Sequence, residues 1–292
     1  MNNATTVGAA TLAWTPGFNG GSAITSYQIV ATPTLVGTIV TRTGIAATAT
    51  SGTITGLVNG TAYTLQVRAV NALGTGPLSA ASNAVTPTGV PGAPTAVVGT
   101  RGNTTVALSW AAPIVDGGTA ITGYTVQVRV AGTVVRTDVL TSAVTTATIT
   151  GLTNGTAYTF RVFATNANGS GALSVASAAV TPASAPTVAP VLGTATLPPV
   201  SQGAVGSPLT ATVNWTGVPV AGNGGSAITG YTATVRNNLG AVVQSVSTAT
   251  AATRSVTFTF SVDPGPYTFE VLAFNTVGDG LASAPSAPIL AR

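Results

Sequence analysis

Three tryptophans divide this 292-residue chain into three similar stretches. Each tryptophan ends a short run of alternating apolar and polar residues, and tyrosines follow it at two corresponding places. The nine aromatic residues of this pattern are Trp14, Trp110, Trp215, Tyr27, Tyr124, Tyr231, Tyr63, Tyr158 and Tyr267. A repeat of about 100 residues is too long for a solenoid unit and suits a whole small domain. We therefore predict three tandem domains, which span residues 1–88, 89–183 and 184–292 and are called repeats one, two and three.

The second repeat shows the local pattern most clearly. Val106, Leu108 and Trp110 alternate with small or polar residues, which indicates a half-buried strand. The runs 124–130 and 158–165 alternate in the same way, and Gly, Pro and Asn residues separate the runs. Short alternating strands at intervals of about 8 to 12 residues are typical of an antiparallel β-sandwich. We therefore predict an all-β fold.

The chain resembles the fibronectin type III family. The resemblance lies in the tryptophan, in the early tyrosine of the next strand, and in the Gly-Leu-x-Asn-Gly-Thr-x-Tyr corner at residues 56–63 and 151–158. It continues in an Asn…Gly-x-Gly loop followed by serine. The third repeat departs from this pattern, because a shorter turn at residues 262–267 replaces the corner and the approach to its tryptophan is longer.

The resemblance implies a seven-stranded, immunoglobulin-like sandwich of two sheets for each repeat. It also implies that the nine aromatic residues are structural core, and that the corner tyrosine returns its hydroxyl group to nearby backbone. Proline-rich segments at residues 86–94 and 181–190 join the repeats. Because proline fixes φ and extends the chain, we expect semi-rigid joints and hence a rod.

Charged residues are scarce, at 5% of the chain against a typical share of about 25%. All nine basic residues are arginines, and they are scattered singly. A nucleic-acid surface needs a basic stripe, so we expect no nucleic-acid partner. No run of about 18 apolar residues occurs, so we expect no membrane span. Low charge with abundant Thr, Ala, Gly and Val is typical of bacterial surface proteins and virion proteins, which favours an extracellular, cell-surface or virion location.

The residues that usually carry chemistry are missing or dispersed. The chain has no His, Cys or Lys. Its five acidic residues are dispersed over the second and third repeats, and they are Asp116, Asp138, Asp263, Glu270 and Asp279. A glycosidase needs two carboxylates across one bond, and a calcium loop needs several clustered oxygen ligands. We therefore predict no catalytic, cofactor-binding or metal-binding residues, no cofactor and no enzymatic activity.

Two features suggest association with other molecules. Outward positions of the strand after the corner are apolar, and Phe163, Leu272 and Phe274 form a candidate assembly surface. Repeat one also starts late, because Met1 falls opposite Val97 when the tryptophans are aligned. Its first strand is therefore expected to be truncated. Either the sequence was cut from a longer array, or the sheet has an open edge beside Leu12–Trp14, which would be a pairing site for another chain.

Two functions remain open from the sequence. The leading hypothesis is a non-catalytic structural or adhesive rod in a bacterial extracellular fibre, sheath or surface assembly, or in a virion decoration. Its partners would be other copies of itself or neighbouring surface or virion proteins. The alternative is an accessory array of a secreted polysaccharide-degrading enzyme, for which polysaccharide is a candidate partner.

Overall fold

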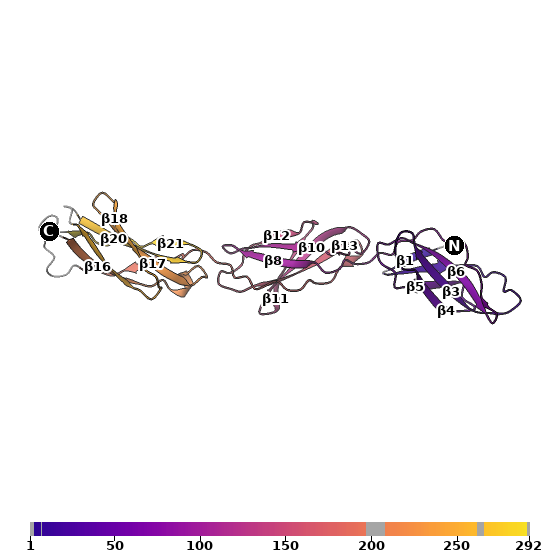
Figure 1. The fold of residues 1–292 in the computed structure, drawn as a ribbon. Coiled ribbons are helices and arrows are strands. Elements are labelled where there is room, and N and C mark those ends of the chain that lie inside the picture. Colours follow the sequence, from indigo (N-terminus) through magenta and orange to yellow (C-terminus); the bar gives the residue numbers. More distant parts are fainter. Residues whose placement is uncertain (1–2, 7, 197–207, 262–265, 291–292) are drawn as a thin grey trace. The chain divides into compact units, whose positions relative to one another are not determined.

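The structure, a computed structural model, describes residues 3–6, 8–196, 208–261 and 266–290 (Figure 1). Apart from one short 3-10 turn, η1 (Val220–Gly222), the elements of this described part are all β-strands. They form antiparallel sheets that follow the repeats, so the all-β sandwich prediction is confirmed. No helix among the described residues is long and apolar enough to cross a membrane.

Repeat one contains two sheets that share no strand. The three-stranded sheet has the order β1-β2-β5, with bounds Asn3–Thr6, Ala9–Ala13 and Ser51–Thr55. The four-stranded sheet has the order β4-β3-β6-β7, with bounds Val40–Ala46, Ile24–Pro33, Tyr63–Asn71 and Gly74–Thr75. Seven strands in two sheets are the architecture that the sequence resemblance implied.

Repeat two has the same division into sheets. The three-stranded sheet has the order β12-β9-β8, with bounds Thr146–Ile149, Val106–Ala111 and Thr95–Arg101. The four-stranded sheet has the order β11-β10-β13-β14, with bounds Thr133–Leu140, Ile121–Val130, Thr159–Asn166 and Gly169–Ser170. Buried and exposed residues alternate strictly along β9, as the sequence pattern predicts for a strand with one face toward the core.

Repeat three repeats the plan with one additional short strand. One sheet has the order β15-β16-β19, with bounds Val191–Leu192, Pro208–Thr216 and Ser255–Ser261. The other has the order β18-β17-β20-β21, with bounds Val242–Ser247, Ile228–Arg236, Pro266–Asn275 and Asp279–Ala282, and β22 (Ile289–Leu290) pairs with β20. Residues 262–265 of the predicted shorter turn at 262–267, and residues 198–203 of the longer approach, lie outside the described residues.

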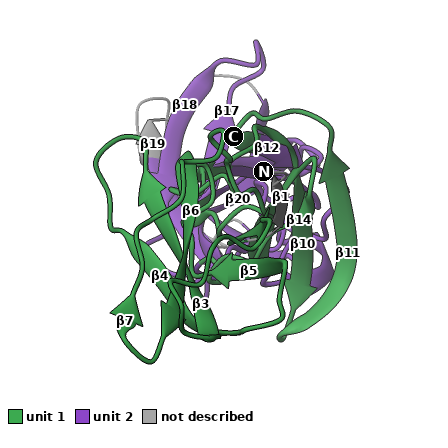
Figure 2. Cartoon of the chain, turned by 90° about the vertical axis from the view of Figure 1, so that its right-hand side faces the viewer, with its two compact units in different colours: residues 1–98, 109–146, 160–177 green, residues 99–108, 147–159, 178–292 purple. Residues whose placement is uncertain are grey.

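Contacts group the described chain into two compact units (Figure 2). Unit 1 comprises residues 1–98, 109–146 and 160–177, and unit 2 comprises residues 99–108, 147–159 and 178–292. The division passes through repeat two. The predicted domain boundaries near residues 88 and 184 and the rod therefore stay predictions.

The short strand β1 changes one expectation about repeat one. It pairs antiparallel with β2 from Asn3 opposite Leu12 to Thr6 opposite Ala9. With four residues it is shorter than β8, which has seven. β1 therefore covers the edge of β2 from Ala9 to Leu12, so the expected open edge is wrong at Leu12, whereas the register with β1 does not extend to Ala13 or Trp14.

Candidate binding surface: the loop cleft of repeat one

The nine aromatic residues of the repeat pattern are all buried. In each repeat the tryptophan ring contacts the ring of the first tyrosine. The centroid separations are 5.1 Å for Trp14–Tyr27, 5.2 Å for Trp110–Tyr124 and 5.5 Å for Trp215–Tyr231, with tilted or edge-on rings. This geometry is favourable for aromatic pairs and places their area in the core. These residues therefore belong to the cores of the repeats, and Trp14 and Tyr27 also lie in the lining of a cleft in repeat one.

Burial has an electrostatic consequence in repeat two. It raises the pKa of Tyr124 above the usual tyrosine value, and the neighbouring Trp110 side chain opposes part of this shift. Removal of water disfavours the charged phenolate, which explains the direction. Tyr124 therefore stays neutral at physiological pH and acts as a packing residue.

The acidic residues do not gather into a chemical site. Asp138 pairs with Arg136 at 2.7 Å, and Glu270 pairs with Arg236 at 3.0 Å. Asp116 accepts a hydrogen bond from the Gly118 amide at 2.7 Å, which is ordinary turn geometry. Asp263 lies outside the described residues. Within the described ranges no group of three or more His, Cys, Asp or Glu residues could hold a metal ion.

The candidate assembly surface is only half exposed. Phe163, Leu272 and Phe274 are each partly buried in the structure. A Cβ atom placed on Gly230 would lie 2.5 Å from Cζ of Phe274, so that ring rests on the neighbouring strand of its own repeat. Contacts within the repeat account for part of the burial of Phe274, and an assembly role stays a prediction.

A loop junction in repeat two holds the segment that enters it. Asn166, at the end of β13, donates from Nδ2 to the carbonyl oxygens of Gly89 at 2.8 Å and Asp116 at 2.7 Å. The amide of Gly89 in turn donates to the carbonyl oxygen of Gly117 at 2.7 Å. One buried asparagine therefore connects the incoming segment to the loop between β9 and β10.

A buried asparagine makes the corresponding contacts in repeat three. Asn275, at the end of β20, donates from Nδ2 to the carbonyl oxygens of Ser184 at 2.8 Å and Asn223 at 2.9 Å. The amide of Ser184 donates to the carbonyl oxygen of Gly224 at 2.8 Å. The proline-rich segments before repeats two and three are thus hydrogen-bonded into corresponding loops.

Repeat one has the corresponding asparagine without an incoming segment among the described residues. Asn71 donates from Nδ2 to the carbonyl oxygen of Asn19 at 3.0 Å. Beside it lies a cleft of about 680 Å³, formed by the loops at residues 15–20 and 73–79. We call this cleft the copy-one cleft. Its rim carries Phe18 and Leu73, whose exposed fractions are 92% and 82%.

This cleft was not predicted from the sequence, in which the Gly-x-Gly loops at residues 74–76 and 169–171 served only as part of the family resemblance. The sequence signal for a docking position was the repetition of a Gly-Gly pair before β3, β10 and β17, at residues 20–21, 117–118 and 224–225. The repeated glycine pair indicates a docking position only when the structure shows which atoms lie against it.

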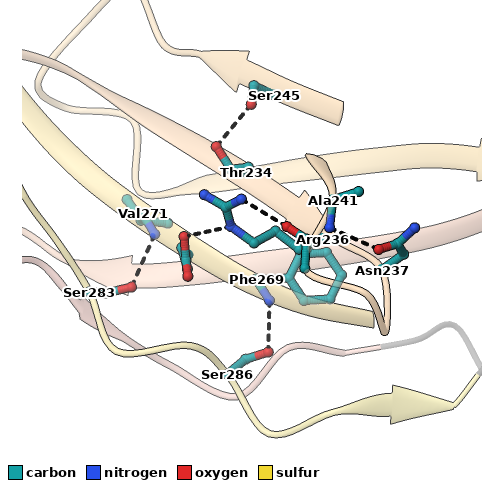
Figure 3. Close-up of polar contacts among 11 residues, drawn as sticks. Thr234, Arg236, Asn237, Ala241, Ser245, Phe269, Val271, Ser283 and Ser286 are labelled. Atoms are coloured by element: carbon teal, nitrogen blue, oxygen red, sulfur yellow. Dashed lines mark hydrogen bonds and ion pairs between the residues drawn. The ribbon is translucent and has the colours of Figure 1, made fainter. Parts of the chain in front are cut away.

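In each repeat a serine pair holds the segment that follows β7, β14 or β21 against the neighbouring strand β6, β13 or β20. In repeat three the amides of Val271 and Phe269 donate to Oγ of Ser283 and Ser286, each at 3.0 Å (Figure 3). The amides of the same serines donate back to the carbonyl oxygens of Val271 and Phe269. The corresponding serines of the other repeats are Ser79, Ser82, Ser174 and Ser177. Serine hydroxyls therefore replace backbone acceptors along a segment that does not form a regular ladder.

These features define a class: tandem immunoglobulin-like sandwich modules with buried aromatic cores and hydrogen-bonded entry loops. The family model "Fibronectin type III domain" matches residues 2–85 and 92–180, which together are more than half of the chain. The chain belongs to this family. The corner tyrosines bear out the resemblance, because the hydroxyls of Tyr63 and Tyr158 accept hydrogen bonds from the amides of Val58 and Thr153.

Two curated relatives are enzymes by name. Endoglucanase B of Cellulomonas fimi is 39% identical over 194 residues, which are 61% of this chain and 17% of that protein. Chitinase A1 of Niallia circulans is 38% identical over 191 residues, which are 60% of this chain and 25% of that protein. The chain thus spans a quarter or less of the length of these relatives.

Other matches are less extensive or more distant. The Kelch domain-containing protein SSO1033 of Saccharolobus solfataricus is 36% identical over 117 residues, which are 40% of this chain and 16% of that protein. Among solved structures, the chicken CNTN1 FN1-FN3 domains match with a TM-score of 0.44 and 23% identity, covering 99% of this chain and 96% of that chain.

Proposed function

We propose that this chain is a non-catalytic accessory array of a secreted polysaccharide-degrading enzyme. The similarity to Endoglucanase B and Chitinase A1 carries this proposal, because each alignment is long enough to span about two repeats. Both are enzymes of polysaccharide breakdown by name, and the match in each covers a minor part of the protein. This origin favours an extracellular location.

We further propose that the array acts as a spacer and does not itself grip the polysaccharide. Sugar-binding faces usually present exposed aromatic rings in a row. Here every tryptophan and tyrosine of the repeat pattern is buried, and among the aromatic side chains whose burial the structure describes, Phe18 is the one that is strongly exposed. A single ring in a loop is a poor stacking platform for a sugar chain.

Comparison of insoluble and soluble substrates tests the spacer role. The array would be inserted between the catalytic domain and the carbohydrate-binding domain of an endoglucanase, and a direct fusion would serve as the control. We expect faster hydrolysis of insoluble cellulose and unchanged hydrolysis of a soluble oligosaccharide, because a spacer changes reach and leaves the catalytic site alone. Equal rates on insoluble cellulose would contradict the proposal.

A binding assay separates spacer from sugar-binding module. The chain alone would be mixed with insoluble cellulose and with chitin and then sedimented. We expect the chain to stay in the supernatant as a non-binding control protein does. Retention that Phe18→Ser abolishes would instead assign a sugar-binding role to the loops of repeat one.

The structural or adhesive fibre, including virion decoration, stays a prediction. The comparisons favour the accessory array over it, since two of the relatives that they name are an endoglucanase and a chitinase.

A further inference from the structure

We propose that the copy-one cleft is a docking site for another fibronectin type III module. The occupant would present an Asn-Gly turn of the kind at residues 59–60 together with the proline-bearing segment that follows it. The proposal does not depend on the enzyme-accessory function, because it rests on contacts within the chain. Two occupied examples of the same site, in repeats two and three, define the chemistry of the occupant.

The first example is the glycine pair of repeat two. A Cβ atom on Gly117 would lie 2.1 Å from the carbonyl oxygen of Gly89, and one on Gly118 would lie 2.6 Å from the amide nitrogen of Gly60. The amide of Gly60 also donates to the carbonyl oxygen of Pro87 at 2.8 Å. The pair therefore lies against both parts of the occupant: the Asn-Gly turn and the segment that follows.

The second example is the glycine pair of repeat three. A Cβ atom on Gly224 would lie 2.4 Å from the carbonyl oxygen of Ser184, and one on Gly225 would lie 2.3 Å from the amide nitrogen of Gly155. The amide of Gly155 donates to the carbonyl oxygen of Pro182 at 2.9 Å. The same two elements meet the same two glycines, so the arrangement is a repeated docking contact.

Repeat one has the glycine pair with open space around it. A Cβ atom on Gly20 or Gly21 would have no neighbour within 4 Å among the described residues. Both residues have positive φ, at 65° and 81°, so their backbone conformation also favours glycine. The glycine pair shows that the space beside it is free, but its positive φ already explains why glycine stands there. A glycine whose φ is ordinary would instead indicate that the missing side chain makes room for an occupant.

The last glycine of the Gly-x-Gly loop supplies that argument, because its φ is not positive in any repeat. In repeat two a Cβ atom on Gly171 would lie 2.2 Å from the carbonyl oxygen of Pro91. In repeat three a Cβ atom on Gly280 would lie 2.7 Å from Cβ of Pro186. These glycines let the proline of the incoming segment approach the loop.

Gly76 occupies the corresponding place in repeat one. The nearest atom to a Cβ on Gly76 is the carbonyl oxygen of Ala69 at 3.4 Å, which is an ordinary contact. Neither its backbone nor its described neighbours therefore require glycine. Because Gly76 has no side chain, it leaves free the same space that the prolines occupy beside Gly171 and Gly280.

The lining of the copy-one cleft suits this occupant. Phe18 and Leu73 offer apolar surface to a proline ring. Asn71 occupies the position of Asn166 and Asn275, which donate hydrogen bonds to carbonyl groups of the incoming segments in repeats two and three. Arg68, the charged residue in the lining, already donates to Oε1 of Gln28 at 3.0 Å. An uncharged, carbonyl-rich extended segment fits this surface better than an acidic one.

The end of repeat three is a poor candidate for the occupant. Its sequence at residues 262–265 is Val-Asp-Pro-Gly, in place of the Leu-x-Asn-Gly corner of the other two repeats. A module with the corner sequence of repeat one or two matches the site. This difference separates the proposal from head-to-tail association of identical chains.

The test adds such a module in register. A second copy of residues 1–96 would be placed immediately before Met1 of the full chain. Met1 then follows an Ala96, just as Val97 follows Ala96 in the native sequence. Hydrogen exchange read by mass spectrometry would then compare segments 17–23 and 71–79 in the native and extended chains. We expect exchange in both segments to slow by about tenfold or more, because docking suppresses local opening.

Matched alanine variants identify the contact. Gly76→Ala should leave the native chain unchanged in melting temperature and exchange, and it should abolish the slowing in the extended chain. Gly171→Ala in the native chain is the positive control, because its site is already filled, and it should speed exchange in residues 86–94.

Three results would overturn the proposal. They are unchanged exchange at residues 17–23 and 71–79 in the extended chain, slowing that survives Gly76→Ala, and a Gly171→Ala variant that behaves as the native chain does. Analytical sedimentation tests whether a second copy of this chain is the occupant instead. A native chain that dimerises, and that Gly76→Ala converts to a monomer, would assign the cleft to a second copy of this chain.

Discussion

The backbone amide of Thr153 donates a hydrogen bond to the phenolic oxygen of Tyr158 at 3.1 Å. Val58 and Tyr63 form the same bond in repeat one at 3.2 Å. In both cases the tyrosine ring is buried, and the hydroxyl closes the corner between two strands. The bond therefore holds the Asn-Gly turn against the buried tyrosine of the core.

Removal of this hydroxyl should weaken repeat two. Tyr158→Phe keeps the ring and removes the acceptor of the exposed Thr153 amide, and one hydrogen bond of this kind typically contributes about 0.5–1.5 kcal/mol. Urea unfolding followed by hydrogen exchange of repeat-two peptides would measure the change. The matched Tyr63→Phe variant should show a loss in repeat one only. An unchanged midpoint for Tyr158→Phe would show that the bond adds nothing to stability.

The serine pair gives a second prediction. Ser283→Ala removes the Oγ that accepts from the buried amide of Val271, and we expect a loss of about 1–3 kcal/mol in the unfolding free energy of repeat three. Ser245, whose hydroxyl interacts with Thr234 on an exposed strand, is the control (Figure 3). Ser245→Ala should change stability by less than about 0.5 kcal/mol. Equal effects of the two variants would contradict this assignment.

The entry asparagines should differ in importance between repeats. Asn166→Ala removes two donated bonds, to Gly89 and Asp116, whereas Asn71→Ala removes one, to Asn19. We therefore expect Asn166→Ala to be the more destabilising by about 1 kcal/mol, the usual net contribution of one hydrogen bond. Denaturation followed separately in each repeat by hydrogen exchange would compare them. A larger loss for Asn71→Ala would refute this ranking.

Alkaline pH should destabilise repeat two through Tyr124. Burial raises the pKa of this side chain in the folded state, so the folded chain holds the proton more tightly than the unfolded chain. The resulting stabilisation is fully present below the unfolded tyrosine pKa of about 10 and is lost as pH rises through the folded value. Urea unfolding of repeat two between pH 9 and 11 should show this decline.

Tyr124→Phe is the control for the pH effect. It removes the ionisable group and keeps the ring against Trp110, so the decline should become shallower. Identical slopes for Tyr124→Phe and the native chain would show that another group controls alkaline unfolding.

Local chemistry in the sequence was enough to predict the fold class and the buried aromatic residues. The alternation of Val106, Leu108 and Trp110 defines a strand with one buried face, because side chains of a strand point to opposite sides in turn. The corner sequences before Tyr63 and Tyr158 predicted their hydroxyl bonds through the family resemblance. These features depend on residues that are close in sequence or carry a distinct pattern.

Tertiary structure alone decided what the glycines do. Gly76 and Gly171 stand in the same motif, yet only Gly171 has an incoming proline against it. Likewise Asn166 reaches the carbonyl oxygen of Gly89 across 77 residues, and Asn71 has a bond to Asn19 in its place. Sequence patterning records periodicity and turn chemistry, whereas the space beside a glycine depends on segments brought together from distant parts of the chain. The sequence therefore determined the modules, and the tertiary structure decided which of their entry clefts are filled.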